Sequence, residues 1–156
     1  MAVSGYATSP GVLAQRKSTA YTVMIMTVSL IALFTAVKIR FKQIIGILKI
    51  RRRSELLPIN RMEYRVFSQH REDGVIDHIL ASIGVESGRF VEFGFAANQS
   101  NCLNLALNRK FSGVFIDGSR EKCHIAKKAF RWLGLRNVKV VHSFLTIENL
   151  NSVING

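Results

Sequence analysis

The stretch Arg89-Phe-Val-Glu-Phe-Gly-Phe-Ala-Ala-Asn-Gln99 decides the fold, together with Gly113-Val-Phe-Ile-Asp-Gly118 further along the chain. Each contains a short apolar run that closes on an acidic residue and a glycine. A short apolar run bounded in this way is typical of a parallel strand that is covered on both faces. We therefore predict buried strands over residues 90–93 and 114–116, and we expect their ends to face a ligand crevice.

Helical and strand patterns alternate through the rest of the C-terminal part of the chain. Apolar residues recur at helical spacing, Ser119 can cap one helix, and Gly84 and Gly134 can each end one. Helices are predicted at 72–83, 101–108, 119–133 and after Thr146, and a third strand at 138–141. Strands that alternate with such helices are joined by right-handed crossovers into a parallel sheet. The prediction is a three-layer α/β fold with three parallel strands.

The N-terminal part is apolar and basic. Residues 21–37, YTVMIMTVSLIALFTAV, carry no charge, which fits a transmembrane helix of about 17–25 residues. A cleaved signal peptide is the alternative, but its apolar core is usually about 7–15 residues, and no small-residue cleavage pair precedes Lys38. We predict a retained single-pass anchor at 21–37, after a disordered tail over 1–20 and before a basic juxtamembrane segment and linker over 38–60.

The formal net charge of +12 is concentrated beside this anchor. Arg16 and Lys17 precede it, whereas a denser run of lysine and arginine follows between Lys38 and Arg53. Because positive charge is retained on the cytoplasmic side, the C-terminal domain is predicted to be cytoplasmic. The basic segment alternates apolar and charged positions, so we expect it to lie along anionic lipid headgroups. Such clusters also bind nucleic-acid phosphates, but the adjacent span favours the membrane.

Candidate ligand-binding residues follow the strands, at the sheet edge where open α/β folds bind ligands. Glu92 and Gly94 end the first strand, and the glycine lets the backbone approach a ligand closely. Asp117 can accept hydrogen bonds from both hydroxyls of a ribose, although Asp-Gly is also a common turn. The loop lacks the Gly-x-Gly-x-x-Gly pattern of dinucleotide sites. Cys123-His124 has no second pair at ligand spacing, so no metal is assigned.

Four motifs resemble the FkbM-type S-adenosylmethionine-dependent methyltransferases. They are SQHREDGVI from Ser68, FVEFG from Phe90, GVFIDG from Gly113 and VKVVHSF from Val138. The similarity covers residues 67–153. It implies an incomplete Rossmann-like class I methyltransferase fold over 61–156, with S-adenosylmethionine as the cofactor.

The resemblance also implies which residues hold the cofactor. Those after the first strand would surround its methionine part, Asp117 would take the ribose, and the residues after the third strand would border the adenine. The full set is Glu92, Gly94, Phe95, Ala96, Asn98, Asp117, Gly118, Ser143 and Phe144. This chain has Ala96-Ala97-Asn98 where the family usually has a further acidic residue and a glycine.

The expected function is that of a membrane-anchored methyltransferase acting on a hydroxyl group of a sugar, lipid or small metabolite. In the family a fourth strand ending in acidic residues faces the substrate, so we interpret the chain, which stops at Gly156, as a fragment and assign no catalytic residue. Two alternatives stay open. The fold could be an interaction module of a non-enzymatic single-pass membrane protein, or it could serve a nucleotide-dependent oxidoreductase.

Overall fold

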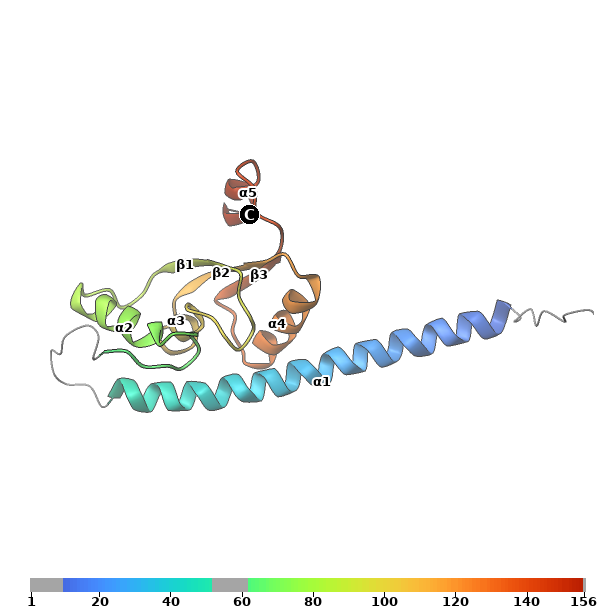
Figure 1. The fold of residues 1–156 in the computed structure, drawn as a ribbon, viewed down its shortest axis with the longest axis horizontal. Coiled ribbons are helices and arrows are strands. Elements are labelled where there is room, and N and C mark those ends of the chain that lie inside the picture. The colour runs from blue at the N-terminus through green and yellow to red at the C-terminus, as the bar shows by residue number, and fades with distance from the viewer. Residues whose placement is uncertain (1–9, 52–61, 156) are drawn as a thin grey trace, which may run out of the picture.

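The computed structural model describes residues 10–51 and 62–155, and it shows the predicted order of helices and strands (Figure 1). The elements are α1 (Pro10–Arg51), α2 (Glu72–Ser82), β1 (Arg89–Phe93), α3 (Leu103–Asn108), β2 (Ser112–Asp117), α4 (Arg120–Trp132), β3 (Val138–His142) and α5 (Leu150–Asn155). Each predicted strand is confirmed and is longer by one to three residues. Residues 1–9 of the predicted tail and 52–60 of the predicted linker lie outside the described residues.

The three strands form one parallel sheet in the order β1-β2-β3. In its register Val91 pairs with Val114, which pairs with Lys139, so the three carboxyl ends meet at the same edge. The predicted helix signals act as expected. The Ser119 side chain accepts a hydrogen bond from the Lys122 amide at 3.3 Å, and Gly134 ends α4 with a φ of 72°.

A cluster of phenylalanine rings joins the sheet to α4. The ring of Phe115, on β2, lies 5.0 Å from those of Phe90 and Phe95 and 5.4 Å from that of Phe130, measured between centroids. These spacings are typical of offset or edge-to-face aromatic pairs, which stabilise a core beyond the area they bury. The cluster therefore fixes α4 and the loop after β1 on one face of the sheet.

The opposite face is only partly covered. On β1, Val91 is 37% exposed and Phe93 is 65% exposed, whereas Ile116 on the central strand is buried. The expectation that both strands are covered on both faces is therefore wrong for β1. The reason is that α3 and α4 both lie on the face that carries Phe90 and Phe115 (Figure 1), so the alternate residues of β1 face outward.

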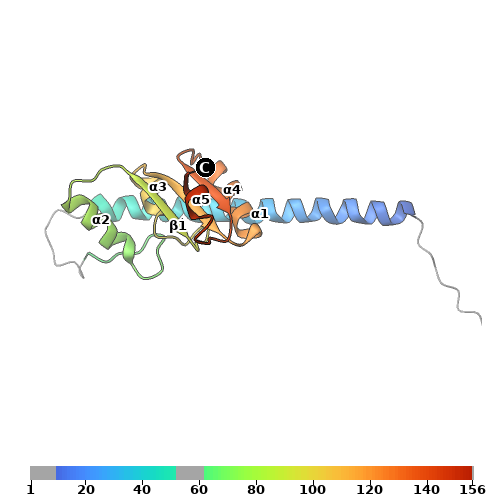
Figure 2. The ribbon, with the colours of Figure 1, turned by 90° about the horizontal axis from the view of Figure 1, so that it is seen from above.

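Helix α1 is a single continuous element across the predicted boundary between anchor and juxtamembrane segment. It begins at Pro10, a residue favoured in the first turn of a helix, so residues 10–20 are helical rather than disordered. Its N-terminal part projects beyond the α/β domain, as the view from above shows (Figure 2). Thr19–Leu48 is long and apolar enough to cross a membrane, by length and composition.

One face of α1 docks on the α/β domain. Ala32, Ala36 and Ile39 are buried at helical spacing, and α1 contacts both α3 and α4. A methyl group added at Gly46 would lie 3.0 Å from a methyl of Val66, so glycine permits a close approach there. Four hydrogen bonds cross the contact: Lys128 Nζ to Ser29 Oγ, Arg40 to the Leu133 carbonyl, Lys42 Nζ to the Asn98 carbonyl and Gln43 to the Leu107 carbonyl.

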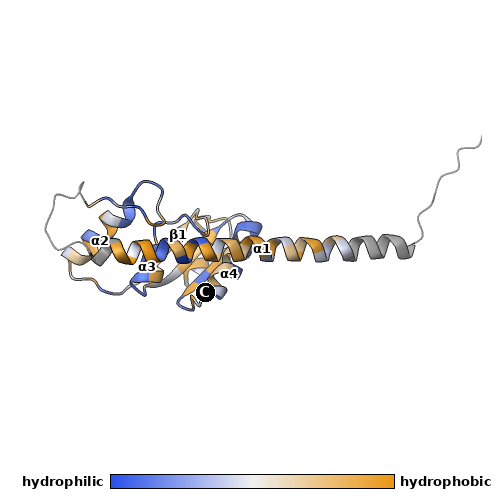
Figure 3. Cartoon of the chain, turned by 90° about the horizontal axis from the view of Figure 1, so that it is seen from below, coloured by the Kyte–Doolittle hydropathy of each residue, from blue (hydrophilic) through white to orange (hydrophobic). Residues whose placement is uncertain are grey.

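The other face of α1 is apolar and exposed. Phe34, Val37 and Phe41 are each about three-fifths exposed or more, and hydrophobic residues run along much of the side turned away from the sheet (Figure 3). The predicted span at 21–37 therefore overlaps the docked stretch, which starts at Ser29. With the domain docked, a bilayer can contact residues 29–37 only from this outer side.

A buried carboxylate ties the segment before α2 to that helix. Asp73 is 1% exposed, and its Oδ2 accepts hydrogen bonds from the amides of Val66, Phe67 and Ser68 and from the Ser68 hydroxyl, at 2.7–2.8 Å. At the next residue, Gly74, an added Cβ would lie 1.9 Å from a backbone oxygen, so no other residue fits. The first of the four motifs thus has a structural role here.

Removing the Ile39 side chain tests the docking of α1. Ile39→Ala should lower the free energy of unfolding by about 2–4 kcal/mol, because it leaves a cavity between α1 and the domain. Ile44→Ala removes the same atoms from the exposed face and should cost under about 0.5 kcal/mol. Urea unfolding of the full chain in mild detergent, followed by Trp132 fluorescence, measures both. Equal effects would contradict the docked arrangement.

The Asp73 cluster makes a second stability prediction. Asp73→Ala leaves three buried amides without an acceptor, at a cost of about 1–3 kcal/mol for each, so the variant should fail to unfold cooperatively. Asp73→Asn keeps an acceptor oxygen and should lose less. Glu86→Ala, an exposed site, serves as the control for thermal unfolding. If the Asp73→Ala variant melted at the same temperature as the parent chain, the carboxylate would not be what holds the segment before α2.

Candidate functional site

The parallel register brings the three predicted parts of the site to one edge of the sheet. The Gly94 amide donates a hydrogen bond to the Ile116 carbonyl at 3.0 Å, and the Ser143 amide donates to the Asp117 carbonyl at 3.1 Å. The residues that follow β1, β2 and β3 are therefore neighbours in space. This arrangement was predicted from the alternation of strands and helices.

Glu92 shapes the loop after β1. Its carboxylate accepts hydrogen bonds from the Ser100 hydroxyl at 2.6 Å and from the amides of Asn101 and Cys102 at 2.9 Å. Both carboxylate oxygens are engaged, and the amides are those that lead into α3. Glu92 therefore closes the loop onto the sheet, and its contribution to a ligand site is to position that loop.

The loop between Gly94 and Asn98 divides into a buried part and an open part. The Phe95 side chain is buried in the ring cluster, so it points away from the edge of the sheet. Ala96 is half-buried, and its backbone amide and carbonyl both form hydrogen bonds with the backbone of Gln99. Gly94, by contrast, is exposed at a φ of 74°, with no atom within 4 Å of where a Cβ would lie. The open backbone at Gly94 is the part of the loop that a ligand can approach.

Asn98 connects this loop to α1. Its carbonyl accepts a hydrogen bond from Lys42 Nζ at 3.0 Å. Lys42 belongs to the basic segment that is predicted to contact lipid headgroups, and no local sequence pattern relates it to Asn98, which is far away in the chain. The structure therefore adds Lys42 to the residues that hold the candidate site in shape.

Asp117 ends the central strand with one oxygen available. Its Oδ1 accepts a hydrogen bond from the Ser119 amide at 2.7 Å, whereas its Oδ2 lies 3.9 Å from Lys122 Nζ. A carboxylate in this position can accept hydrogen bonds from a ligand hydroxyl.

An exposed aromatic ring lies beside Asp117. An added Cβ at Gly118 would lie 2.4 Å from the ring of Phe144, so this ring covers the glycine, yet it is 76% exposed. His142 contacts the Gly118 carbonyl through Nε2 at 3.0 Å, which holds the end of β3 beside this turn. Ser143 Oγ bonds to the Phe144 carbonyl. The edge therefore offers a carboxylate, an open backbone and an aromatic face.

The two cysteines near this edge are free, and the pKa of each thiol is raised. Burial raises the pKa of Cys102 to about 12, and the charge and hydrogen bond of Glu92 add to the effect. Burial, and then the charge of Asp117, also raise the pKa of Cys123. Since the thiolate is the nucleophile, neither residue is suited to covalent catalysis near neutral pH. Among the described residues, no three His, Cys, Asp or Glu side chains are grouped to hold a metal ion.

Comparisons with protein-family models, with curated proteins and with solved structures find no match to this chain. The function must therefore be inferred from the residues themselves. At this edge the features suited to a ligand are Asp117, Gly94 and Phe144.

The reactivity of Cys102 tests the position of Glu92. In a Cys123→Ala background at about pH 8, Cys102 should react with a disulfide reagent more than about 100-fold more slowly than in the urea-unfolded chain, because so little thiolate is present. Glu92→Gln removes the negative charge and should speed the reaction, whereas Glu86→Gln should not. A rate unchanged by Glu92→Gln would mean that this carboxylate does not contact Cys102.

Proposed function

We propose that this chain binds S-adenosylmethionine at the carboxyl edge of its sheet and is part of a methyltransferase that acts on hydroxyl groups. The observation that carries the proposal is the position of Asp117 Oδ2 at the end of the central strand, where its one contact among the described residues is a 3.9 Å ion pair with Lys122. Ligands of open α/β sheets bind at this edge, and a single carboxylate there can accept both hydroxyls of a ribose.

The other residues of the edge suit the rest of the cofactor. The exposed ring of Phe144 offers a stacking surface for adenine, with Ser143 beside it. The open backbone of Gly94 suits the methionine part. When bound, the cofactor supplies a methyl group on a sulfonium, and its transfer depends on aligning the acceptor oxygen with that methyl. The chain's own contribution is to hold the cofactor in a fixed orientation.

The sheet also supports a Rossmann-like methyltransferase fold. Three parallel strands in the order β1-β2-β3, with α3 and α4 in the crossovers, correspond to one half of a doubly wound sheet. In such a sheet a fourth strand would pair with the outer edge of β1. The exposed residues Val91 and Phe93 lie on that strand.

A dinucleotide oxidoreductase fits this edge less well. In a dinucleotide site the pyrophosphate binds the amides at the start of the helix after the first strand. Here the amides of Asn101 and Cys102 bind the carboxylate of Glu92 instead. A pyrophosphate would have to displace a carboxylate of the protein, so an adenosine ligand without one is the better match.

A non-enzymatic interaction module has one observation in its favour. The apolar face formed by Val91 and Phe93 is exposed on the side of the sheet away from α4. A partner protein could cover that face without any cofactor. In that case Phe93→Asp would abolish partner binding while changes at Asp117 would have no effect.

We also place the domain at the cytoplasmic surface of a membrane, with α1 as its single anchor. Thr19–Leu48 supports this assignment, as does the basic run from Lys38 to Arg53, which suits anionic headgroups except at Arg40 and Lys42, whose side chains bond to the domain. The outer face of α1 would meet lipid while its inner face holds the domain. A hydroxyl acceptor on a lipid, sugar or small metabolite would then be methylated close to the bilayer.

Calorimetric titration of the full chain with S-adenosylhomocysteine tests the proposal. Asp117→Asn keeps an oxygen for the Ser119 amide but presents an amide to the ribose, so affinity should fall about 10- to 100-fold while thermal stability is kept. Glu121→Gln, an exposed neighbour, is the matched control, and NAD should bind more weakly than S-adenosylhomocysteine. Equal affinity of the parent and Asp117→Asn, or no binding by the parent, would refute the proposal.

A further inference from the structure

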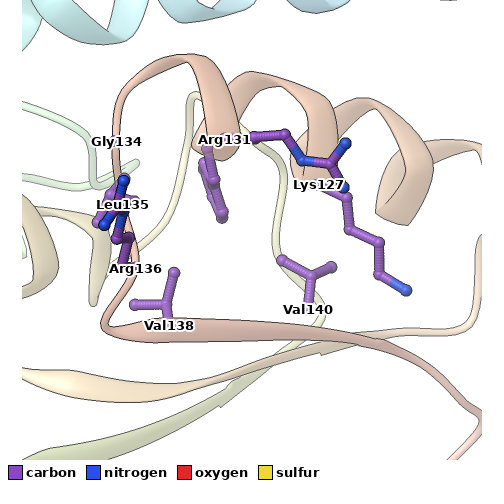
Figure 4. Close-up of a pocket in the computed structure, with 8 residues that line it drawn as sticks. Lys127, Arg131, Gly134, Leu135, Arg136, Val138 and Val140 are labelled. Atoms are coloured by element: carbon purple, nitrogen blue, oxygen red, sulfur yellow. The ribbon is translucent and has the colours of Figure 1, made fainter.

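A cavity lies between α4 and β3, away from the carboxyl edge. Its volume is about 340 Å³, within the range of small-ligand sites (Figure 4). Its apolar lining consists of Phe130, Leu135, Val138 and Val140, and three cations, Lys127, Arg131 and Arg136, line it as well. Val138 and Val140 belong to the first part of β3, whereas the candidate cofactor site lies beyond its last residue. The two sites are therefore separate.

The backbone explains why the three cations line the same cavity. Lys127 and Arg131 are four residues apart on α4, so their side chains leave the same side of the helix. Gly134, at a φ of 72°, reverses the chain, and Arg136 then returns beside the cavity. In Figure 4 Lys127 and Arg131 extend from the helix on one side, and Val138 and Val140 rise from the strand on the other.

These cations are not neutralised within the part of the chain that the structure describes. The ion pairs seen there join Arg109 to Asp77 and Lys122 to Asp117. Three like charges around one small cavity repel each other, and an anion bound among them would remove that repulsion. Arginine suits phosphate in particular, because its planar fork donates two parallel hydrogen bonds.

The apolar lining narrows the choice of anion. A bare inorganic ion would leave Leu135, Val138 and Val140 without a partner, whereas an anion with an attached hydrocarbon chain would cover them. α4 packs against α1, the helix that is apolar enough to cross a membrane. With α1 at a bilayer, as proposed above, a lipid is one source of such an amphiphilic anion.

We propose that the cavity between α4 and β3 binds a phosphate monoester that carries an apolar chain. The phosphate contacts Lys127 and Arg131 on α4, Arg136 adds positive charge at the other end of the cavity, and the chain lies on Phe130, Leu135, Val138 and Val140. This chemistry is found in phosphatidic acid and in soluble alkyl phosphates.

The test is calorimetric titration of the full chain in a neutral detergent with three probes: inorganic phosphate, hexyl phosphate and short-chain phosphatidic acid. Both amphiphiles should bind at least about tenfold more tightly than inorganic phosphate, because they alone cover the apolar lining. If phosphatidic acid binds more tightly than hexyl phosphate, the natural ligand is a lipid. If the two bind equally, the natural ligand is a soluble phosphate ester.

Variants separate a built site from general attraction to a basic protein. Arg131→Gln should weaken amphiphile binding about tenfold or more, whereas Arg120→Gln, on the same helix but outside the cavity, should leave it unchanged. Val138→Phe fills the apolar part of the cavity. It should weaken the binding of hexyl phosphate and phosphatidic acid and leave the binding of inorganic phosphate unchanged. Equal losses in Arg131→Gln and Arg120→Gln, or amphiphile affinity unchanged by Val138→Phe, would overturn the proposal.

Discussion

The docking of α1 is the constraint on which the rest of the structure depends. A helix that is apolar on all sides must find apolar surroundings on all sides. The α/β domain supplies apolar surroundings on one side, where Ala32, Ala36 and Ile39 pack into its helical layer. The side that carries Phe34 and Phe41 stays exposed. Whatever covers that outer side, a bilayer in our proposal, is therefore held at a fixed distance from the sheet.

The same contact reaches the candidate site. Lys42 bonds to the Asn98 carbonyl in the loop after β1, and Glu92 holds the far end of that loop to the sheet. The open backbone at Gly94 belongs to the same loop, four residues before Asn98. A movement of α1 away from the domain would break the first attachment and release part of the loop. In our proposal, membrane attachment and ligand binding would be coupled through this hydrogen-bonded loop, with α1 as the connecting element.

Much of the fold could be predicted from the sequence because its signals are local. Apolar runs mark the strands, and Ser119 and Gly134 act at the ends of α4 as their chemistry predicts. The docking of α1 could not be predicted, because a helix without a polar face gives no sign of which side is covered. The burial of Phe95 depends on rings from β2 and α4, and the partners of Glu92 depend on how the loop closes. The approach of the loops after β1, β2 and β3 at the carboxyl edge was predictable, because it follows from parallel strands alone. The cavity between α4 and β3 was not predictable.

A scan of single spin labels along residues 28–46 of α1 tests the docked helix most directly. The full chain, with both cysteines replaced, would be placed in lipid nanodiscs, and collisions with oxygen and with an aqueous nickel reagent would be measured at each label. The account predicts a helical period, with labels at 32, 36 and 39 shielded from both reagents and labels at 34, 37 and 41 open to oxygen. Uniformly high oxygen collision from 28 to 37, without that period, would mean that α1 is a free span and that the domain does not dock on it.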